Sequence, residues 1–316
     1  MKPFAFIFPG QGSQSVGMLD AWGDHAVVRQ TLQEASDALG EDLAQLIHEG
    51  PKEALALTTN TQPVMLVAGV AAYRVWMAEV GVAPQAVAGH SLGEYAALVA
   101  AGSLTLAQAA PLVRLRAQAM QDAVPVGVGA MAAILGMDAL RVAALCAEVT
   151  QEFGAASAEV VEAANFNDPS QTVISGSKAA VDRACEVLKV NGAKRALILP
   201  VSAPFHSSLM LPAAQKLQQR LAEVEFAAPQ IALVNNIDVT VESDIARIRD
   251  ALYRQAFGPV RWVETVQAIK ARGIAHLVEC GPGKVLAGMV KRIDAELTGV
   301  AMFDPASLAD AQGALA

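Results

Sequence analysis

A serine between two glycines, in the stretch Gly89-His90-Ser91-Leu92-Gly93, has the pattern of a reactive serine on a sharp turn. A tight turn from a strand into a helix needs small residues on both sides of the serine, because larger side chains would clash there. Backbone N–H groups at the start of the following helix are free to stabilise an oxyanion. The sequence therefore predicts a nucleophilic serine at position 91, and a purely structural glycine turn is the alternative.

A serine hydroxyl is a weak nucleophile until a base removes its proton, and the five histidines are the candidates for that base. His25 and His48 lie in segments with helical, solvent-facing patterns, and His90 should point away from its neighbour on a tight turn. His206 lies in a proline-bounded loop, where catalytic residues tend to lie, and His276 precedes a strand-like segment. The residues alone leave His206 and His276 as alternatives.

The composition argues against several classes of protein. The chain has 316 residues and a net charge of −8, and an acidic balance argues against a nucleic-acid binder. No run reaches the ~18 consecutive apolar residues of a membrane helix, and the first apolar run is too short for a secretory signal. Its three cysteines and five histidines lack metal-ligand spacing. We expect a cytoplasmic protein with reduced thiols and no bound metal.

Strands and helices alternate over much of the chain, which indicates a parallel sheet covered on both faces. Strands are expected at 2–8, 85–88 and 278–280, and helices at 26–39, 64–80, 92–101 and 106–121, with a final helix from about 285. Ser91 thus falls between a strand and a helix, which is the context that the turn requires.

The middle of the chain has a different order of elements. Strand-like segments at 130–135, 160–164, 172–175 and 195–199 and helical segments at 138–151 and 178–190 give the ferredoxin-like order β-α-β-β-α-β. Residues 165–170 have turn-forming types, so we expect Asn165 and Asn167 to lie in a turn outside the site. We predict an α/β-hydrolase-like core with a parallel sheet, formed by 1–128 and 201–316, and an inserted ferredoxin-like subdomain at 129–200.

Seven motifs occur in order along the chain: PGQGSQ (9–14), NTQP (60–63), GHSLGEY (89–95), LVRLRAQAM (112–120), GAMAAILG (129–136), PVSAPFH (200–206) and GPGK (281–284). Each is weak alone, but the ordered set, from about residue 4 to 292, resembles the malonyl-CoA:acyl carrier protein transacylases. These are the stand-alone acyltransferases of bacterial type II fatty-acid synthesis. The resemblance implies transfer of malonyl from malonyl-CoA to the phosphopantetheine thiol of acyl carrier protein, through a malonyl-serine ester, to feed fatty-acid elongation.

The resemblance also implies a role for each residue at a matching position. Ser91 would be the nucleophile, and His206, rather than His276, would be its general base. The backbone carbonyl of Gln255 would orient His206, and the backbone N–H groups of Gln11 and Leu92 would form the oxyanion hole.

Substrate selection is expected to depend on Arg116, Gln62 and Phe205. A helical arginine usually reaches solvent, which we expect of Arg114, but the family pattern makes Arg116 the ligand of the malonyl carboxylate. A planar guanidinium matches a carboxylate with two hydrogen bonds. Gln62 would line the pocket, and the ring of Phe205 would crowd an α-methyl group.

An acidic carrier protein should avoid an acidic enzyme unless the mouth of the site is locally basic. The basic residues Lys284, Lys291 and Arg292 are the candidates for that docking patch, and an ordinary solvated helix face is the alternative. We expect a monomer that binds neither nucleic acid nor a membrane. We also expect no cofactor, because malonyl-CoA and phosphopantetheine are substrates.

Three other functions are compatible with parts of the sequence. A serine hydrolase or thioesterase could use Ser91 with His276 and Asp238, which follow the order Ser, Asp, His. A non-catalytic subunit that binds carrier protein would have no need of an intact nucleophile, base and arginine. The same malonyl transfer could also serve polyketide synthesis or a malonate decarboxylase.

Overall fold

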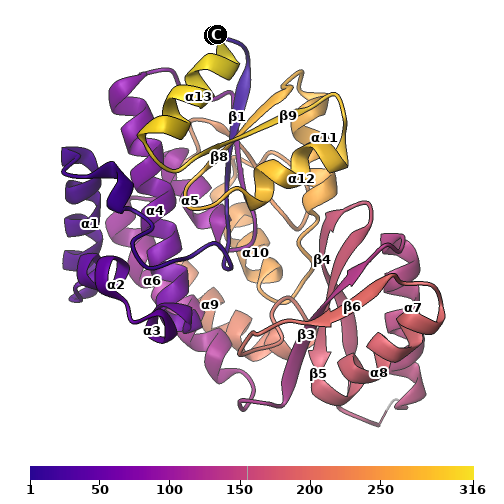
Figure 1. Ribbon diagram of the computed structural model, residues 1–316. Coiled ribbons are helices and arrows are strands. Elements are labelled where there is room, and N and C mark those ends of the chain that lie inside the picture. Colours follow the sequence, from indigo (N-terminus) through magenta and orange to yellow (C-terminus); the bar gives the residue numbers. More distant parts are fainter. Residues whose placement is uncertain (155) are drawn as a thin grey trace.

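The computed structural model describes residues 1–154 and 156–316, and it contains two separate sheets (Figure 1). One sheet is parallel and the other antiparallel. The fold is the α/β class expected from the sequence, with a parallel-sheet core of α/β-hydrolase type and an inserted ferredoxin-like subdomain. None of the helices in the described residues is long and apolar enough to cross a membrane.

The parallel sheet has the strand order β7-β2-β1-β8-β9. Its strands are β1 (Phe4–Phe8), β2 (Ala86–Gly89), β7 (Ala232–Val234), β8 (His276–Cys280) and β9 (Thr298–Met302). The central strand is buried on both faces: the phenylalanines at 4, 6 and 8 pack in one hydrophobic cluster, and Ala5 and Ile7 pack in another. This continuous apolar sequence is typical of a strand covered by helices on both sides.

Most helices cover the face of the parallel sheet that carries the phenylalanines. They are α1 (Ala26–Leu39), α2 (Leu43–Glu49), α3 (Lys52–Ala56), α4 (Thr58–Glu79), α5 (Gly93–Ala100), α6 (Leu106–Asp122), α9 (Leu211–Glu223), α10 (Ile245–Gln255) and α13 (Pro305–Leu315). The other face is covered by α11 (Trp262–Ala271) and α12 (Val285–Ile293). Two short 3-10 helices, Asp20–Trp22 and Ser208–Met210, complete this part.

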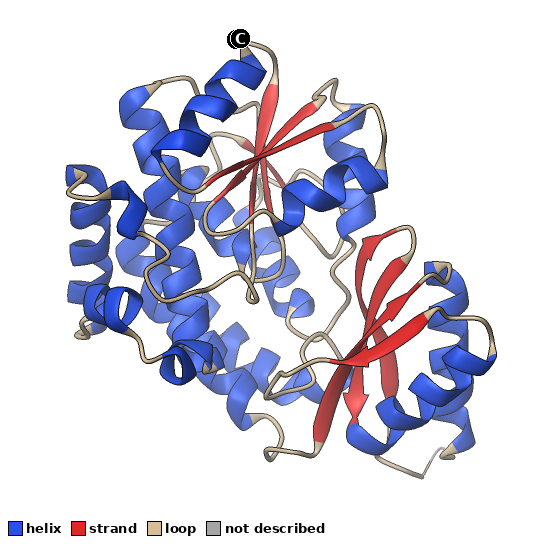
Figure 2. Cartoon of the chain, in the orientation of Figure 1, coloured by secondary structure: helices blue, strands red, loops and turns tan. Residues whose placement is uncertain are grey.

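The antiparallel sheet has the order β4-β5-β3-β6, as in ferredoxin-like folds. It consists of β3 (Gly129–Leu135), β4 (Val161–Asp168), β5 (Gln171–Ser177) and β6 (Arg195–Ile198), with the helices α7 (Ala139–Glu152) and α8 (Lys178–Val190). Figure 2 shows both helices on the side of this sheet that faces away from the parallel sheet. On the other side Met131, Ala133 and Val173 pack with Phe205 of the core. This apolar face therefore forms a wall toward the core.

The turn expected at residues 165–170 is much shorter in the structure. Strand β4 continues through Asp168, and only Pro169 and Ser170 remain between β4 and β5. Two partners hold the extension: residues 165–168 pair with β5 on one side. On the other side, Val260 N–H donates to Ala164 O and the Val260 carbonyl accepts from Phe166 N, both at 2.9 Å. Pairing with a distant segment overrides the local turn preference of these residues.

Two further expectations about element boundaries are wrong. Helix α4 begins at Thr58, six residues before the expected start, and includes Pro63. A proline cannot donate to the carbonyl four residues back, and Thr59 O instead accepts from Arg114 Nη1. The helix that begins at Val285 is also not the last, because β9 and α13 follow it and return the chain to Lys2, whose N–H donates to Leu315 O at 2.7 Å.

Candidate active site

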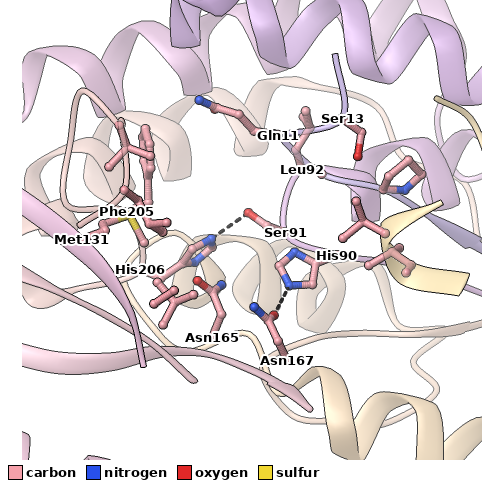
Figure 3. Close-up of a pocket in the computed structure, with 18 of the residues that line it drawn as sticks. Gln11, Ser13, His90, Ser91, Leu92, Met131, Asn165, Asn167, Phe205 and His206 are labelled. Carbon is pink, nitrogen blue, oxygen red and sulfur yellow. Dashed lines mark hydrogen bonds between the residues drawn. The ribbon is translucent and has the colours of Figure 1, made fainter. Parts of the chain in front are cut away.

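Four loops meet at the carboxyl ends of the parallel strands. They follow β1 at Pro9, β2 at His90, β7 at Asn235 and β8 at Gly281. Open α/β sheets bind ligands at this edge. A cavity of about 280 Å³ lies here, lined by the loops after β1 and β2, by the helix that begins at Val285 and by the inner face of the antiparallel sheet. Gln11, Gln62, Ser91, Leu92, Arg116, Phe205 and His206 all line it, and Figure 3 shows several of them around Ser91.

The turn at Ser91 can accept only glycine on either side. A Cβ atom on Gly89 would lie 1.9 Å from the backbone carbon of Gly93, and one on Gly93 would lie 2.1 Å from the carbonyl oxygen of Phe8. Ser91 itself has a φ of 52°, in the left-handed region that non-glycine residues rarely adopt. These close approaches make a sharp strand-to-helix turn that exposes the serine side chain to the cavity.

Ser91 and His206 are in direct contact, with Oγ and Nε2 separated by 2.6 Å (Figure 3). His206 Nδ1 donates to the carbonyl oxygen of Gln255 at 2.8 Å and to that of Gly258 at 3.2 Å. Because both partners are carbonyls, the proton lies on Nδ1, and Nε2 is left to accept from the hydroxyl. Burial, together with the charge of Arg116, lowers the pKa of His206 to about 3, so the ring is neutral near pH 7.

The guanidinium of Arg116 is buried beside the serine, with only 2% of the residue exposed. Nη1 donates to Gln62 Oε1 at 2.6 Å, and Nη2 lies 3.2 Å from both Ser91 Oγ and Gln255 Oε1. Arg116 Nε has no partner among the described residues. All of these acceptors are neutral, and a buried cation without a hydrogen-bonded anion is unfavourable. The pocket is therefore suited to a ligand that carries a carboxylate.

Gln11 and Leu92, whose backbone N–H groups are the expected oxyanion donors, both line the cavity. Neither backbone N–H group donates a hydrogen bond to any residue between 1 and 154 or between 156 and 316. The loop of Gln11 packs tightly on the serine turn, since a Cβ atom on Gly10 would lie 2.7 Å from the carbonyl oxygen of His90. Two free donors beside Ser91 could hold a developing oxyanion.

The structure places the alternative triad apart. His276 begins β8 and pairs with Phe4, at the opposite end of the sheet from the cavity. Both carboxylate oxygens of Asp238 accept from Arg254, each at 2.7 Å. Neither His276 nor Asp238 lines the cavity of Ser91. The hydrolase that would use these two residues has no geometric support.

The basic candidates lie on α12 and the turn before it. Lys284, Lys291 and Arg292 are exposed, and the neighbouring Val285 lines the cavity. Arg292 also has an internal role that the sequence did not indicate, because its Nε donates to Asp168 Oδ2 at 2.8 Å. It thus joins α12 to the end of β4.

Arg114, which we expected at the solvent, is only partly exposed, and its guanidinium contacts Glu41 and Asn60. It does not line the cavity of Ser91.

Several residues at the site were missed by the sequence analysis. Asn165 and Asn167, which we placed in a turn, lie on β4 and line the cavity, and Asn167 Oδ1 lies 2.9 Å from His90 Nε2. Their spacing of two along the chain is the signal in the sequence, because residues two apart in a strand share a face. Asn236 was also missed: its Oδ1 accepts from Ser91 N at 2.8 Å and its Nδ2 donates to Gly89 O at 2.7 Å. Nothing in the local sequence indicated that the Asn236 side chain would bind both ends of the serine turn.

Comparisons with known proteins agree on one family. Residues 5–301 match the model described as an acyl transferase domain. The malonyl CoA-acyl carrier protein transacylase of Salmonella typhimurium is 51% identical over 312 residues, which cover 98% of this chain and 99% of that protein.

Solved structures give the same result. An acyl-carrier-protein S-malonyltransferase from Burkholderia pseudomallei is 63% identical, with a TM-score of 0.95 over 99% of this chain and 100% of that one. A malonyl-transacylase in complex with a type II PKS acyl-carrier protein is 49% identical, also with a TM-score of 0.95 and the same coverage.

Proposed function

The chain belongs to the acyl transferase domain family, and on that premise we propose that it moves malonyl from malonyl-CoA to the phosphopantetheine thiol of an acyl carrier protein. The observation that carries this proposal is the contact of Ser91 Oγ with both a neutral histidine and a buried arginine in one cavity. The histidine is suited to activate the serine, and the arginine is suited to hold a carboxylate.

In the first step the malonyl carboxylate binds Arg116 and the thioester carbonyl lies over Ser91. His206 Nε2 takes the hydroxyl proton as Oγ attacks the carbonyl carbon. The negative charge that develops on the carbonyl oxygen is stabilised by the N–H groups of Gln11 and Leu92. The C–S bond then breaks, the sulfur of coenzyme A takes the proton from His206, and a malonyl ester remains on Ser91.

The second step reverses these roles with a new thiol. His206 takes the proton of the phosphopantetheine thiol, whose sulfur attacks the ester carbonyl. Ser91 leaves with that proton, and malonyl is again a thioester. Since one thioester replaces another, the exchange is close to equilibrium and moves only an acyl group and a proton. The step therefore requires no redox partner, and coenzyme A and phosphopantetheine act as substrates.

Two other lining residues would tune this step. Gln62 accepts from Arg116 Nη1 and would keep the guanidinium aimed at the substrate. Phe205 precedes the base, lines the cavity and would limit bulk at the α-carbon of the acyl group. We assign the mouth of the cavity, with Lys284, Lys291 and the exposed part of Arg292, to the acidic carrier protein, and we propose that the enzyme acts as a monomer.

Intact-mass measurement after mixing with malonyl-CoA tests this function directly. We expect the wild-type protein to gain one malonyl group, the Ser91→Ala variant to gain none, and added carrier protein to remove the group by transfer. Release of free malonate without any carrier protein would contradict the proposal and indicate a hydrolase.

The pathway has two candidates. The curated relatives named malonyl CoA-acyl carrier protein transacylase favour fatty-acid elongation, and the relative solved with a type II PKS acyl-carrier protein favours polyketide synthesis as the second. Transfer rates to a fatty-acid carrier protein and to a polyketide carrier protein from the same organism would separate them, and a faster rate to the polyketide carrier would overturn our preference.

A further inference from the structure

A buried carboxyl group lies directly behind the site and takes no part in the steps above. Glu94 is in the first turn of α5, three residues after Ser91, and is 2% exposed. Its Oε2 accepts from Gln255 Nε2 at 2.8 Å and from the backbone N–H of Asn236 at 3.0 Å. It does not line the cavity. A residue in this position can reach the substrate only through its neighbours.

The first of these neighbours is the side chain of Gln255. Its amide nitrogen donates to Glu94 Oε2 and, at 3.1 Å, to the carbonyl of Ser91. With the nitrogen fixed on that side, the amide oxygen must point the other way, where Arg116 Nη2 lies 3.2 Å from it. A reversed amide would place its NH₂ group against the guanidinium, and two donors would then face each other. Glu94, together with the carbonyl of Ser91, thus orients the amide so that Arg116 meets an acceptor.

The second neighbour is Asn236, whose side chain joins Ser91 N to Gly89 O. Because its own N–H donates to Glu94, the same carboxylate oxygen supports both the serine turn and the arginine. Ser91 needs this support, since its φ of 52° is unfavourable for a residue with a side chain.

We propose that Glu94 is a positioning residue for substrate selection: through the side chain of Gln255 it holds Arg116 where the carboxylate of the acyl group binds. The inference rests on the proposed malonyl transfer and explains how that site prefers acyl groups that end in a carboxylate. This role requires an acceptor oxygen at position 94 on a side chain as long as that of glutamate, so that the oxygen reaches Gln255 Nε2.

Two substitutions at position 94 separate reach from charge. Glu94→Asp keeps the carboxylate but shortens the side chain by one methylene, so its oxygen no longer reaches Gln255. Glu94→Gln removes the ionisable carboxyl group but keeps an oxygen at the same distance. We expect Glu94→Asp to lower the ratio of kcat/KM for malonyl-CoA to that for acetyl-CoA by about tenfold or more, the effect of losing a hydrogen bond to a charged group. Glu94→Gln should keep the ratio within about threefold of wild type.

Gln255→Ala provides the matched test of the route. This variant removes the amide but keeps the backbone carbonyl that accepts from His206. We expect it to lower the malonyl-to-acetyl ratio of kcat/KM as much as Glu94→Asp does. In the double variant Glu94→Asp with Gln255→Ala, the ratio should fall no further than in the more affected single variant, because both substitutions act through one contact. Additive losses would overturn the proposed route.

The remaining outcomes are also decisive. If Glu94→Asp lowers malonyl and acetyl transfer equally, the residue only supports the fold. If Glu94→Gln lowers the malonyl-to-acetyl ratio of kcat/KM, the charge of the residue matters instead. Either result overturns the inference. Thermal unfolding of each variant separates a fold defect from a change of selectivity. If wild-type protein forms no malonyl ester at Ser91, the proposed function fails, whereas an unchanged ratio in an active Glu94→Asp variant refutes the inference alone.

Discussion

At the scale of single residues, the candidate site centres on Ser91 at the end of β2, whose Oγ lies within 3.2 Å of two other side chains. Ser91 Oγ contacts His206 on one side and Arg116 on the other. The histidine is neutral because burial and the neighbouring cation lower its pKa, which leaves Nε2 free to accept a proton at neutral pH. In the proposed function, the arginine would provide the positive charge that binds the carboxylate of the malonyl group.

Loss of the base should slow acylation strongly. We expect His206→Ala to reduce the rate of malonyl-ester formation by about 10²–10⁴-fold, the range for general base catalysis. Stopped-flow or quench measurement of the ester on Ser91 checks this. His276→Ala is the matched control and should keep wild-type rates, because His276 lies at the other end of the sheet. A loss in the control instead would refute the assignment of the base.

Removal of the cation should change which acyl group is accepted. Arg116→Ala should lose malonyl transfer and gain in relative activity on acetyl-CoA, because the carboxylate loses its partner while the shorter acyl group never needed one. Rates with both thioesters measure the effect, and unchanged malonyl kinetics would argue against the assignment.

A smaller residue at position 205 should admit a branched acyl group. Phe205 lines the cavity beside the base, so Phe205→Ser should raise methylmalonyl transfer relative to malonyl transfer. One methyl group changes discrimination by only ~1–3 kcal/mol, so we expect a partial effect. Competition between the two thioesters gives the ratio directly; a constant ratio would mean that the ring does not meet the α-carbon.

At the scale of elements, α12 both borders the cavity and carries the exposed basic residues. Leu286 and Met289 face the cavity, whereas Lys291 faces solvent. The helix is tied to β4 through the contact of Arg292 with Asp168, so its position depends on both sheets. This arrangement would place a carrier protein that docks on α12 next to the opening through which its thiol must pass.

Reversal of charge on this helix should weaken transfer to the carrier protein. We choose Lys284→Glu with Lys291→Glu, because these residues are exposed and lack the internal contact of Arg292. Transfer to carrier protein should slow most at low ionic strength, where charges are least screened, and acylation by malonyl-CoA should change little. Lys189→Glu on α8 with Lys216→Glu on α9, both exposed, is the control, because it changes the net charge by the same amount. Equal effects in test and control variants would exclude the patch.

At the scale of the whole molecule, a second buried carboxyl joins the core sheet to α12. Glu279 Oε2 accepts from Ala287 N at 2.8 Å, while Oε1 has no partner among the described residues. Burial raises the pKa of Glu279 to about 7, although the backbone N–H groups at the start of α12 oppose the shift. The folded protein therefore holds this proton more tightly than the unfolded chain does.

That proton makes the global stability depend on pH in a definite direction. The pKa of Glu279 in the folded protein lies above its unfolded value of 4.5. The contribution of Glu279 to the free energy of unfolding is therefore greatest below pH 4.5 and is lost as the pH rises toward 7. We expect the free energy of unfolding of wild type, relative to Glu279→Gln, to fall by on the order of 3 kcal/mol across this window. Denaturant titrations at several pH values measure the difference. A difference that stays constant, or that rises with pH, would contradict the expected proton linkage.

The sequence by itself determined the class of fold and the main chemical groups, because those depend on local patterns. The glycines around Ser91, the alternation of strands with helices and the order of motifs are all readable within short windows. Helix α1 and helix α8 have the expected bounds for the same reason, since their apolar periodicity and their end residues are local.

Only the tertiary structure decided what depends on contacts between distant segments. The strand at Asn165 pairs on one side with β5 and on the other with the distant Val260, and the hydrogen bond from Ser91 N to Asn236 joins residues 145 positions apart. The orientation of the Gln255 amide follows from Glu94 and Arg116, which come from two other helices. Such choices depend on buried hydrogen-bond partners that no local propensity encodes, and so the network behind the serine could be found only in the folded chain.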